Sequence, residues 1–157
     1  MRSKTLLRIA CSLAVLAAAT LAASGSAAQG PTTTKPHADV IASQWRFPGA
    51  LEAGITSHPT NPILQLEEYA VKQPLGKVWK FYAEKCGFDK EYKEDVVYQT
   101  QGKNAEGGLF IVHDRILNGR RSGYFAYNTK QYTVSVFIVP VPDDPKSTSI
   151  AVTVGVP

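Results

Sequence analysis

The spacing of hydrophobic positions predicts one clear helix. Apolar side chains recur every three or four residues at Leu75, Val78, Trp79, Tyr82 and Cys86. This is the period of one face of an α-helix. Pro74 suits the first turn of a helix, and Gly87 suits the position just after its end. The sequence therefore predicts an amphipathic helix over residues 74–86, whose apolar stripe must be covered by another layer.

Short runs rich in β-branched and aromatic residues predict the strands of that layer. These runs lie at 96–101, 109–117, 120–127, 132–141 and 148–156, and turn residues separate them. Asn118-Gly119 tolerates the positive φ angles of a type I′ turn, so it predicts a tight hairpin. Residues 63–71 fit either a helix or a strand, and we favour a strand.

The alternation in the last run indicates which side of the sheet receives the helix. Ile150, Val152, Val154 and Val156 alternate with small residues, so one face of this strand is aliphatic. The short links between runs favour antiparallel neighbours. The predicted fold class is α+β: one main amphipathic helix packed on a curled antiparallel β-meander of four to six strands.

The N-terminal part of the chain has a different pattern. Arg2, Lys4 and Arg8 precede an apolar run at 9–23, and small residues follow at 24–28. This is the pattern of a secretory signal peptide, which we assign to 1–28. An uncleaved anchor is the alternative, but the run is shorter than the roughly 20 apolar residues that span a bilayer.

The rest of the N-terminal region predicts little regular structure. Residues 29–39 are rich in Pro, Thr and Lys, which predicts a disordered tether. Residues 40–157 form a single predicted α+β domain. It opens with an irregular arm at 40–62 that has room for one short strand or helical turn.

Charge and cysteine content change the picture once the signal peptide is set aside. Removing its three basic residues from the 17 Lys+Arg leaves 14 against 13 Asp+Glu. A nearly neutral domain gives no reason to infer nucleic-acid or membrane binding. Cys86 is then the remaining cysteine, so no intramolecular disulfide is expected. Its place on the apolar stripe predicts an inert core thiol.

His113 is the weak candidate for catalysis. It precedes Asp114 and Arg115, and neighbouring strand residues point to opposite faces, so His113 and Asp114 cannot form a relay. His113 could transfer a proton with Arg121 or Tyr124, which lie across the hairpin. A solvated strand face is the simpler interpretation. The histidines are widely separated in the sequence, so we predict neither a metal nor a cofactor.

A binding surface is the stronger functional hypothesis. Aromatic and cationic residues that could stack on a partner occur at Arg120, Arg121, Tyr124 and Tyr127 in the hairpin, and at Trp45 and Arg46 in the arm. Such residues are typical of interfaces. Aromatic residues in strands also form ordinary cross-strand core pairs, which is the alternative interpretation.

The sequence therefore favours an exported non-enzymatic domain, secreted or periplasmic. It would bind a protein partner or small ligand of the cell envelope through its sheet face or the 117–127 hairpin. Two alternatives stay open. One is a small cell-envelope hydrolase or isomerase that uses His113 with Arg and Tyr partners. The other is an assembly module that pairs by an edge strand.

The signal peptide is directly testable. When the full chain is expressed in a secreting host, we expect cleavage after Ala28, because Ser26 and Ala28 supply the small side chains that signal peptidase requires. Intact-mass measurement and N-terminal sequencing of the exported product should give a chain that begins at Gln29. A membrane-bound product that keeps Met1 would support the uncleaved anchor instead.

Overall fold

The structure is a computed structural model that describes residues 36–50, 56–57 and 63–157. All of these residues belong to one unit, Thr33–Pro157. The predicted signal peptide and tether residues 29–35 lie outside the described part.

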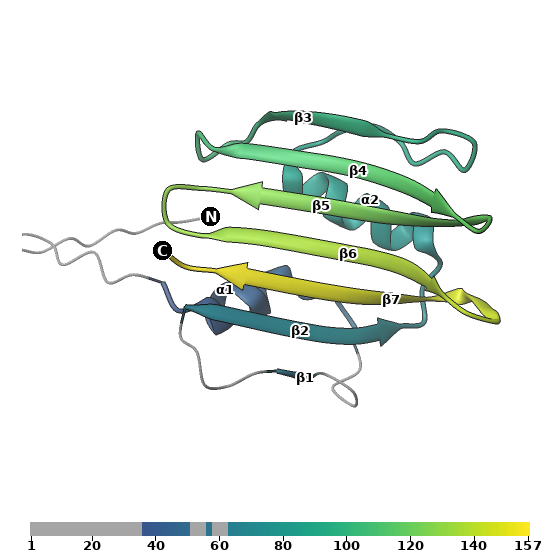
Figure 1. Cartoon of the computed structure of the whole chain (residues 1–157), viewed down its shortest axis with the longest axis horizontal. Coiled ribbons are helices and arrows are strands. Elements are labelled where there is room, and N and C mark those ends of the chain that lie inside the picture. The colour runs from purple at the N-terminus through teal and green to yellow at the C-terminus, as the bar shows by residue number, and fades with distance from the viewer. Residues whose placement is uncertain (1–35, 51–55, 58–62) are drawn as a thin grey trace, which may run out of the picture. The chain divides into compact units, whose positions relative to one another are not determined.

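One antiparallel sheet organises the described residues. Its strands are β1 (Thr56–Ser57), β2 (Leu64–Val71), β3 (Gln99–Lys103), β4 (Leu109–Leu117), β5 (Arg120–Asn128), β6 (Thr133–Val141) and β7 (Asp144–Gly155). The helices are α1 (Ala38–Trp45) and α2 (Leu75–Cys86). The strand order is β1-β2-β7-β6-β5-β4-β3 (Figure 1). The predicted α+β class with an antiparallel sheet is confirmed.

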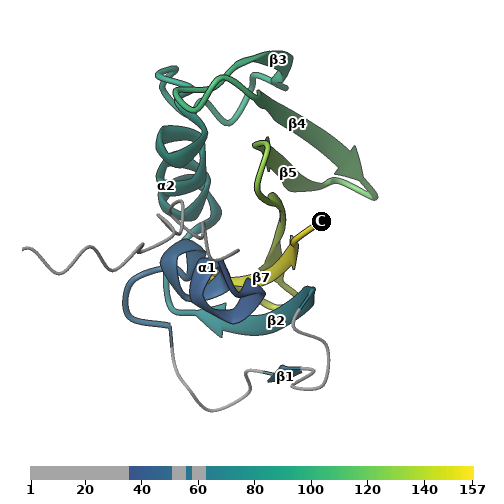
Figure 2. The same ribbon diagram turned by 90° about the vertical axis from the view of Figure 1, so that its left-hand side faces the viewer.

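Strands β3 to β7 form the predicted meander, but β2 lies beside β7. The chain must therefore cross the sheet between β2 and β3, and α2 makes this crossing on one face. Both helices lie on the same face (Figure 1), and the sheet curls around them (Figure 2). We call this covered face the inner face and the opposite one the outer face.

Helix α2 agrees with the prediction from the sequence. Its apolar stripe is buried at all five predicted positions, Leu75, Val78, Trp79, Tyr82 and Cys86. The helix begins just after Pro74 and ends at Gly87, whose φ of 78° is left-handed. The amide of Phe88 donates a hydrogen bond to the carbonyl of Ala83 at 2.8 Å. This closing contact is typical of a helix that ends on glycine.

The predicted hairpin turn is also confirmed. Asn118 and Gly119 have φ angles of 53° and 71°, and both positive values belong to a type I′ turn. Leu117 and Arg120 are the paired residues on either side. This turn sets the register of β4 against β5, so it decides which of their side chains face the helices.

The N-terminal arm differs from its prediction. The predicted tether extended to Asp39 and the predicted arm was irregular, yet Ala38 and Asp39 form the first turn of α1. Its buried residues, Ala38, Ile41, Ala42 and Trp45, repeat at helical spacing. A helix of eight residues is too short to be stable alone. Packing against β2 and β7 therefore stabilises it, and the prediction of one main helix missed this second one.

Trp79 is at the centre of the core. Its side chain is fully buried, and its ring centroid lies 5.0 Å from that of Tyr98 and 5.9 Å from that of Phe125. Rings at these separations contribute beyond their buried area. Trp79 thereby joins α2 to β5 and to the segment that leads into β3.

Trp79→Ala should lower the free energy of unfolding by about 3–5 kcal/mol, because truncation of a large buried aromatic leaves a cavity. Denaturant titration of both chains measures the difference. Lys80→Ala on the exposed side of α2 is the matched control and should stay within about 0.5 kcal/mol of the parent. Equal midpoints for Trp79→Ala and the parent would refute the placement of this helix.

Candidate functional site

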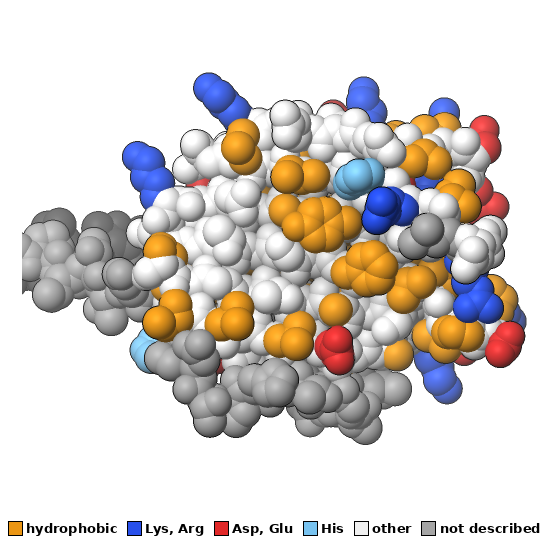
Figure 3. All heavy atoms as spheres, in the orientation of Figure 1, with side chains coloured by type: hydrophobic (Ala, Val, Ile, Leu, Met, Phe, Trp, Pro, Cys, Tyr) orange, Lys and Arg blue, Asp and Glu red, His pale blue; other side chains and the backbone are white. Residues whose placement is uncertain are grey.

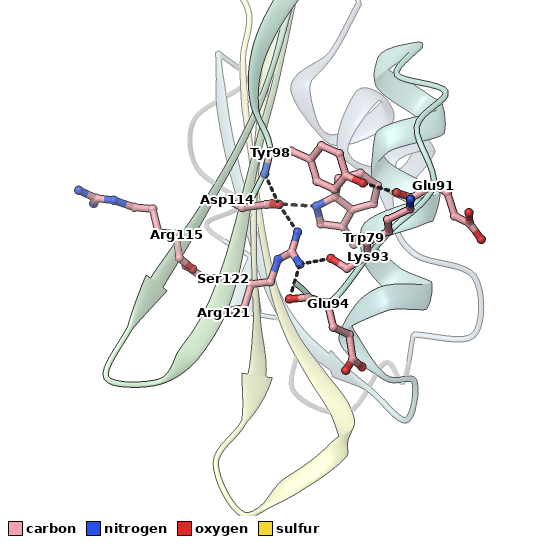
Figure 4. Close-up of polar contacts among 9 residues, drawn as sticks. All are labelled: Trp79, Glu91, Lys93, Glu94, Tyr98, Asp114, Arg115, Arg121 and Ser122. Atoms are coloured by element: carbon pink, nitrogen blue, oxygen red, sulfur yellow. Dashed lines mark hydrogen bonds and ion pairs between the residues drawn. The ribbon is translucent and has the colours of Figure 1, made fainter. Parts of the chain in front are cut away.

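The β4–β5 hairpin presents different chemistry on its two faces. Asp114 and Arg121 point to the inner face beside Trp79, whereas Arg115 points away from it (Figure 4). His113 pairs with Tyr124 and Asp114 pairs with Gly123. The predicted separation of Asp114 from its two neighbours is therefore confirmed.

The carboxylate of Asp114 is the centre of a buried polar network. Asp114 is fully buried. Its Oδ1 accepts a hydrogen bond from Nε1 of Trp79 at 2.8 Å, and its Oδ2 accepts one from the amide of Tyr98 at 3.1 Å. Nη2 of Arg121 donates to the same Oδ2 and forms an ion pair with it. Three donors from three parts of the chain thus converge on one carboxylate.

Arg121 extends this network into the segment that follows α2. Its Nη1 donates to the carbonyls of Lys93 and Glu94, and its guanidinium lies 4.5 Å from the ring centroid of Tyr92. Nε of Arg121 is buried without a hydrogen-bond partner among the described atoms. We predicted Arg121 as a binding residue, but the structure places it in the interior, where it holds residues 92–94 against the sheet.

The residues of the hypothetical enzyme site do not converge. His113 lies on the outer face and Arg121 lies on the inner face, so the sheet separates them. Their predicted cooperation was wrong, because Arg121 pairs with Ile116 and shares the face of Asp114. Tyr124 does lie beside His113 on the outer face.

The other predicted binding residues divide between surface and interior. Arg120 is exposed at the start of β5. Trp45 and Tyr127 are buried and contact each other, with ring centroids 5.3 Å apart. Arg46 donates to both carboxylate oxygens of Glu67 at 2.9 and 3.1 Å, which fastens the chain after α1 to β2. Of the predicted binding residues, Arg120 and Tyr124 are the exposed ones.

The outer face carries an aromatic row that crosses the sheet. Successive Cα partners in this row are His113, Tyr124, Phe137, Ala151 and Glu68. Tyr124 is 36% exposed and Phe137 is 44% exposed. Neither helix lies over this face, and apolar side chains gather at its middle (Figure 3). We call these five residues the outer row.

Phe137, Ala151 and Glu68 are the members of the outer row that sequence reasoning missed. In β6, Val134, Val136 and Ile138 are buried on the inner face, and Phe137 stands between them on the other. Side chains along a strand alternate between its two faces with a period of two residues. This alternation was present in the sequence and could have identified Phe137 as an outer residue. Glu68 needed the order of the strands, because its neighbour Ala151 lies far along the chain.

The charges on the outer face are distributed unevenly. Lys103, Arg115 and Arg120 are exposed on the β3–β5 side of the outer face, and Glu68 is exposed on β2. A shallow, open hollow lies over β3 and β4 and includes Gln99, Gln101, Ile111 and His113 among its lining residues. The outer face therefore has a basic side, an aromatic centre and an acidic residue on the opposite side.

The thiol of Cys86 is not part of the outer face. Cys86 is fully buried and unpaired with another cysteine, as the sequence predicted. Burial raises the pKa of the Cys86 thiol to about 12, so it is protonated at neutral pH and a poor nucleophile. Within residues 36–50, 56–57 and 63–157, no three His, Cys, Asp or Glu side chains gather as metal ligands would.

Comparisons with known proteins give no relative from which a function could be transferred. No protein-family model, no curated protein and no solved structure matches this chain. In the described part of the chain, neither helix has the length and apolar character to cross a bilayer.

Asp114→Asn should lower the free energy of unfolding by about 3–5 kcal/mol, because it leaves the Arg121 guanidinium buried without a counter-charge. Denaturant titration measures this loss, and Asp89→Asn at an exposed site is the control. Adding Arg121→Met to Asp114→Asn removes both charges and should recover part of the stability. A double variant that is less stable than Asp114→Asn alone would contradict this account of the network.

Proposed function

We propose that this protein is an exported, non-enzymatic domain that binds a protein partner through the outer face of its sheet. One observation carries the proposal: Tyr124 and Phe137 lie side by side on neighbouring strands and are both exposed. Both helices lie on the other face of the sheet (Figure 1). Large aromatic side chains of this kind supply much of the binding energy at protein interfaces.

The surroundings of this aromatic pair favour a protein partner over a small ligand. Ala126, Ser135 and Thr153 follow one another in the neighbouring cross-strand row. Their small side chains leave a flat surface next to the aromatic rings. Sites for small molecules are concave and enclose most of the ligand, whereas the hollow over β3 and β4 is open and shallow. A flat surface with aromatic residues at its centre resembles a protein interface.

Charge indicates how the partner is oriented. Arg115 and Arg120 are exposed on the β4–β5 side of the outer face, and no acidic residue on β4 or β5 shares that face, because Asp114 points inward. A partner should therefore present apolar atoms to Tyr124 and Phe137 and a carboxylate to this basic side. Such complementarity contributes mainly to specificity and to the rate of association.

The inner network supports the same function by holding the surface rigid. Asp114 and Gly123 lie next to His113 and Tyr124 in the hairpin, so the buried contacts of Asp114 anchor the two strands, β4 and β5, that carry His113 and Tyr124. A surface that does not have to be ordered on binding loses less conformational entropy. The backbone of Tyr124 is thus held against the helical layer.

The edge of the sheet is a weaker candidate for pairing with another chain. Strand β3 ends the strand order and has five residues, Gln99–Lys103, all polar or glycine. Short, polar edge strands that carry lysine are a common protection against edge-to-edge pairing. We therefore favour the outer face over the edge.

Site-specific photo-crosslinking in the cells from which the chain comes tests this proposal. A benzoylphenylalanine in place of Phe137 should form a light-dependent adduct with a protein. The same group in place of Lys80, on the exposed side of α2, should not. Tyr124→Glu added to the Phe137 substitution should reduce the adduct roughly thirtyfold, as loss of a central aromatic contact costs about 2 kcal/mol. Equal labelling from both positions would count against the outer face as the binding surface.

A further inference from the structure

We infer that the partner is a second copy of this chain, and that the two outer faces pack about a two-fold axis along β6. This inference rests on the proposed function of the outer face. It comes from the arrangement of side chains in the rows that cross the sheet, because these rows are complementary to themselves.

Strand β6 is the middle one of five neighbouring strands, β2-β7-β6-β5-β4. Neighbours in this series are antiparallel, so β2, β6 and β4 run in the same direction. The outer residues of β4 and β2 therefore lie at matching positions on opposite sides of β6.

Three rows of Cα partners show this match. The first row is Leu109, Asn128, Thr133, Gly155 and Leu64. The second row is Ile111, Ala126, Ser135, Thr153 and Leu66. The third is the outer row, His113, Tyr124, Phe137, Ala151 and Glu68. In each row the third residue lies on β6.

Consider a two-fold axis that runs parallel to β6, between two facing sheets. It places β4 of one copy opposite β2 of the other, and β5 opposite β7. Phe137 then meets Phe137 of the second copy. Tyr124 faces Ala151 of the second copy, so a large side chain lies over a small one. His113 faces Glu68 of the second copy, which pairs an imidazole with a carboxylate.

The two remaining rows are complementary as well. Leu109 faces Leu64, and Ile111 faces Leu66, so apolar side chains meet apolar side chains. Leu109 and Leu64 are 52% and 48% exposed, which is the exposure that such contacts would remove. A two-fold interface has to be complementary to itself, and these three rows of the outer face meet that condition.

The shape of the sheet determines where contact is closest. Face-to-face sheets pack with their strands within about 30° of each other. Because the sheet curls toward its helices (Figure 2), the outer surface recedes on both sides of β6. Phe137 and Tyr124 should therefore contribute most, whereas His113 and Glu68 lie near the rim, where ion pairs are worth less.

Analytical ultracentrifugation over a wide concentration series tests the inference. The full chain is expressed, and the product that accumulates is purified. We expect a monomer–dimer equilibrium. Phe137→Glu should weaken association about a hundredfold or more, because it places two carboxylates together on the axis. Lys80→Glu, on the helical side, should leave association unchanged. Thermal unfolding of each variant shows that it has folded.

A charge exchange tests the predicted facing of His113 and Glu68. His113→Glu alone should weaken the dimer roughly tenfold, because two like-charge contacts of about 0.5–1 kcal/mol form. Adding Glu68→Lys to the same chain should restore association to near the parent value. Failure of the second substitution to restore it would overturn the two-fold arrangement.

Cysteine cross-linking tests the position of the axis. Phe137→Cys should form a disulfide-linked dimer rapidly with copper phenanthroline as oxidant, because the axis brings the two thiols together. Lys80→Cys should not form such a dimer. Cys86 is buried, so it should not cross-link in either variant. A chain that stays monomeric and cross-links equally slowly at both positions would overturn the inference.

If benzoylphenylalanine at position 137 then labels a different protein, the proposed function remains and the partner is that protein. If it labels none, both fail.

Discussion

The carboxylate of Asp114 is the constraint on which the rest of this structure depends. It is fully buried, and donors from α2, from the segment before β3 and from β5 reach it through Trp79, Tyr98 and Arg121. Removing one partner from a buried ion pair costs several kcal/mol. The contacts that satisfy this carboxylate must therefore form together, and they join the helix to both strands of the hairpin.

This inward carboxylate also determines what the outer face displays. Side chains alternate along a strand, so a shift of one residue would bring Asp114 outward and His113 and Arg115 inward. The network around Asp114 makes that shift costly. The Asn118-Gly119 turn favours the same register. The positions of His113, Tyr124 and their basic neighbours on the outer face thus follow from a contact on the inner one.

Local patterns predicted what depends on neighbouring residues. The stripe around Trp79, the stop at Gly87 and the turn at Asn118-Gly119 were all readable from the sequence. Helix α1 was missed because tertiary packing stabilises it and its flanks are rich in turn residues. Arg121 was assigned to a binding surface because it is a cationic residue among the aromatic residues of the hairpin. Its true partners, Asp114 and the carbonyls of residues 93 and 94, depend on the path of the chain after α2.

The aromatic pair on the outer face has a physical consequence for the whole domain. The helices cover one face of the sheet, while Tyr124 and Phe137 keep apolar surface exposed on the other. Cys86, the cysteine of the described part, is free and buried, so no disulfide adds to the packing and hydrogen bonds that stabilise this unit. Binding at the outer face would bury the second apolar surface and stabilise the folded state by mass action. Association of this kind would serve stability as well as recognition. Such a double role would account for aromatic rings on a face where an antiparallel sheet commonly presents polar side chains to water.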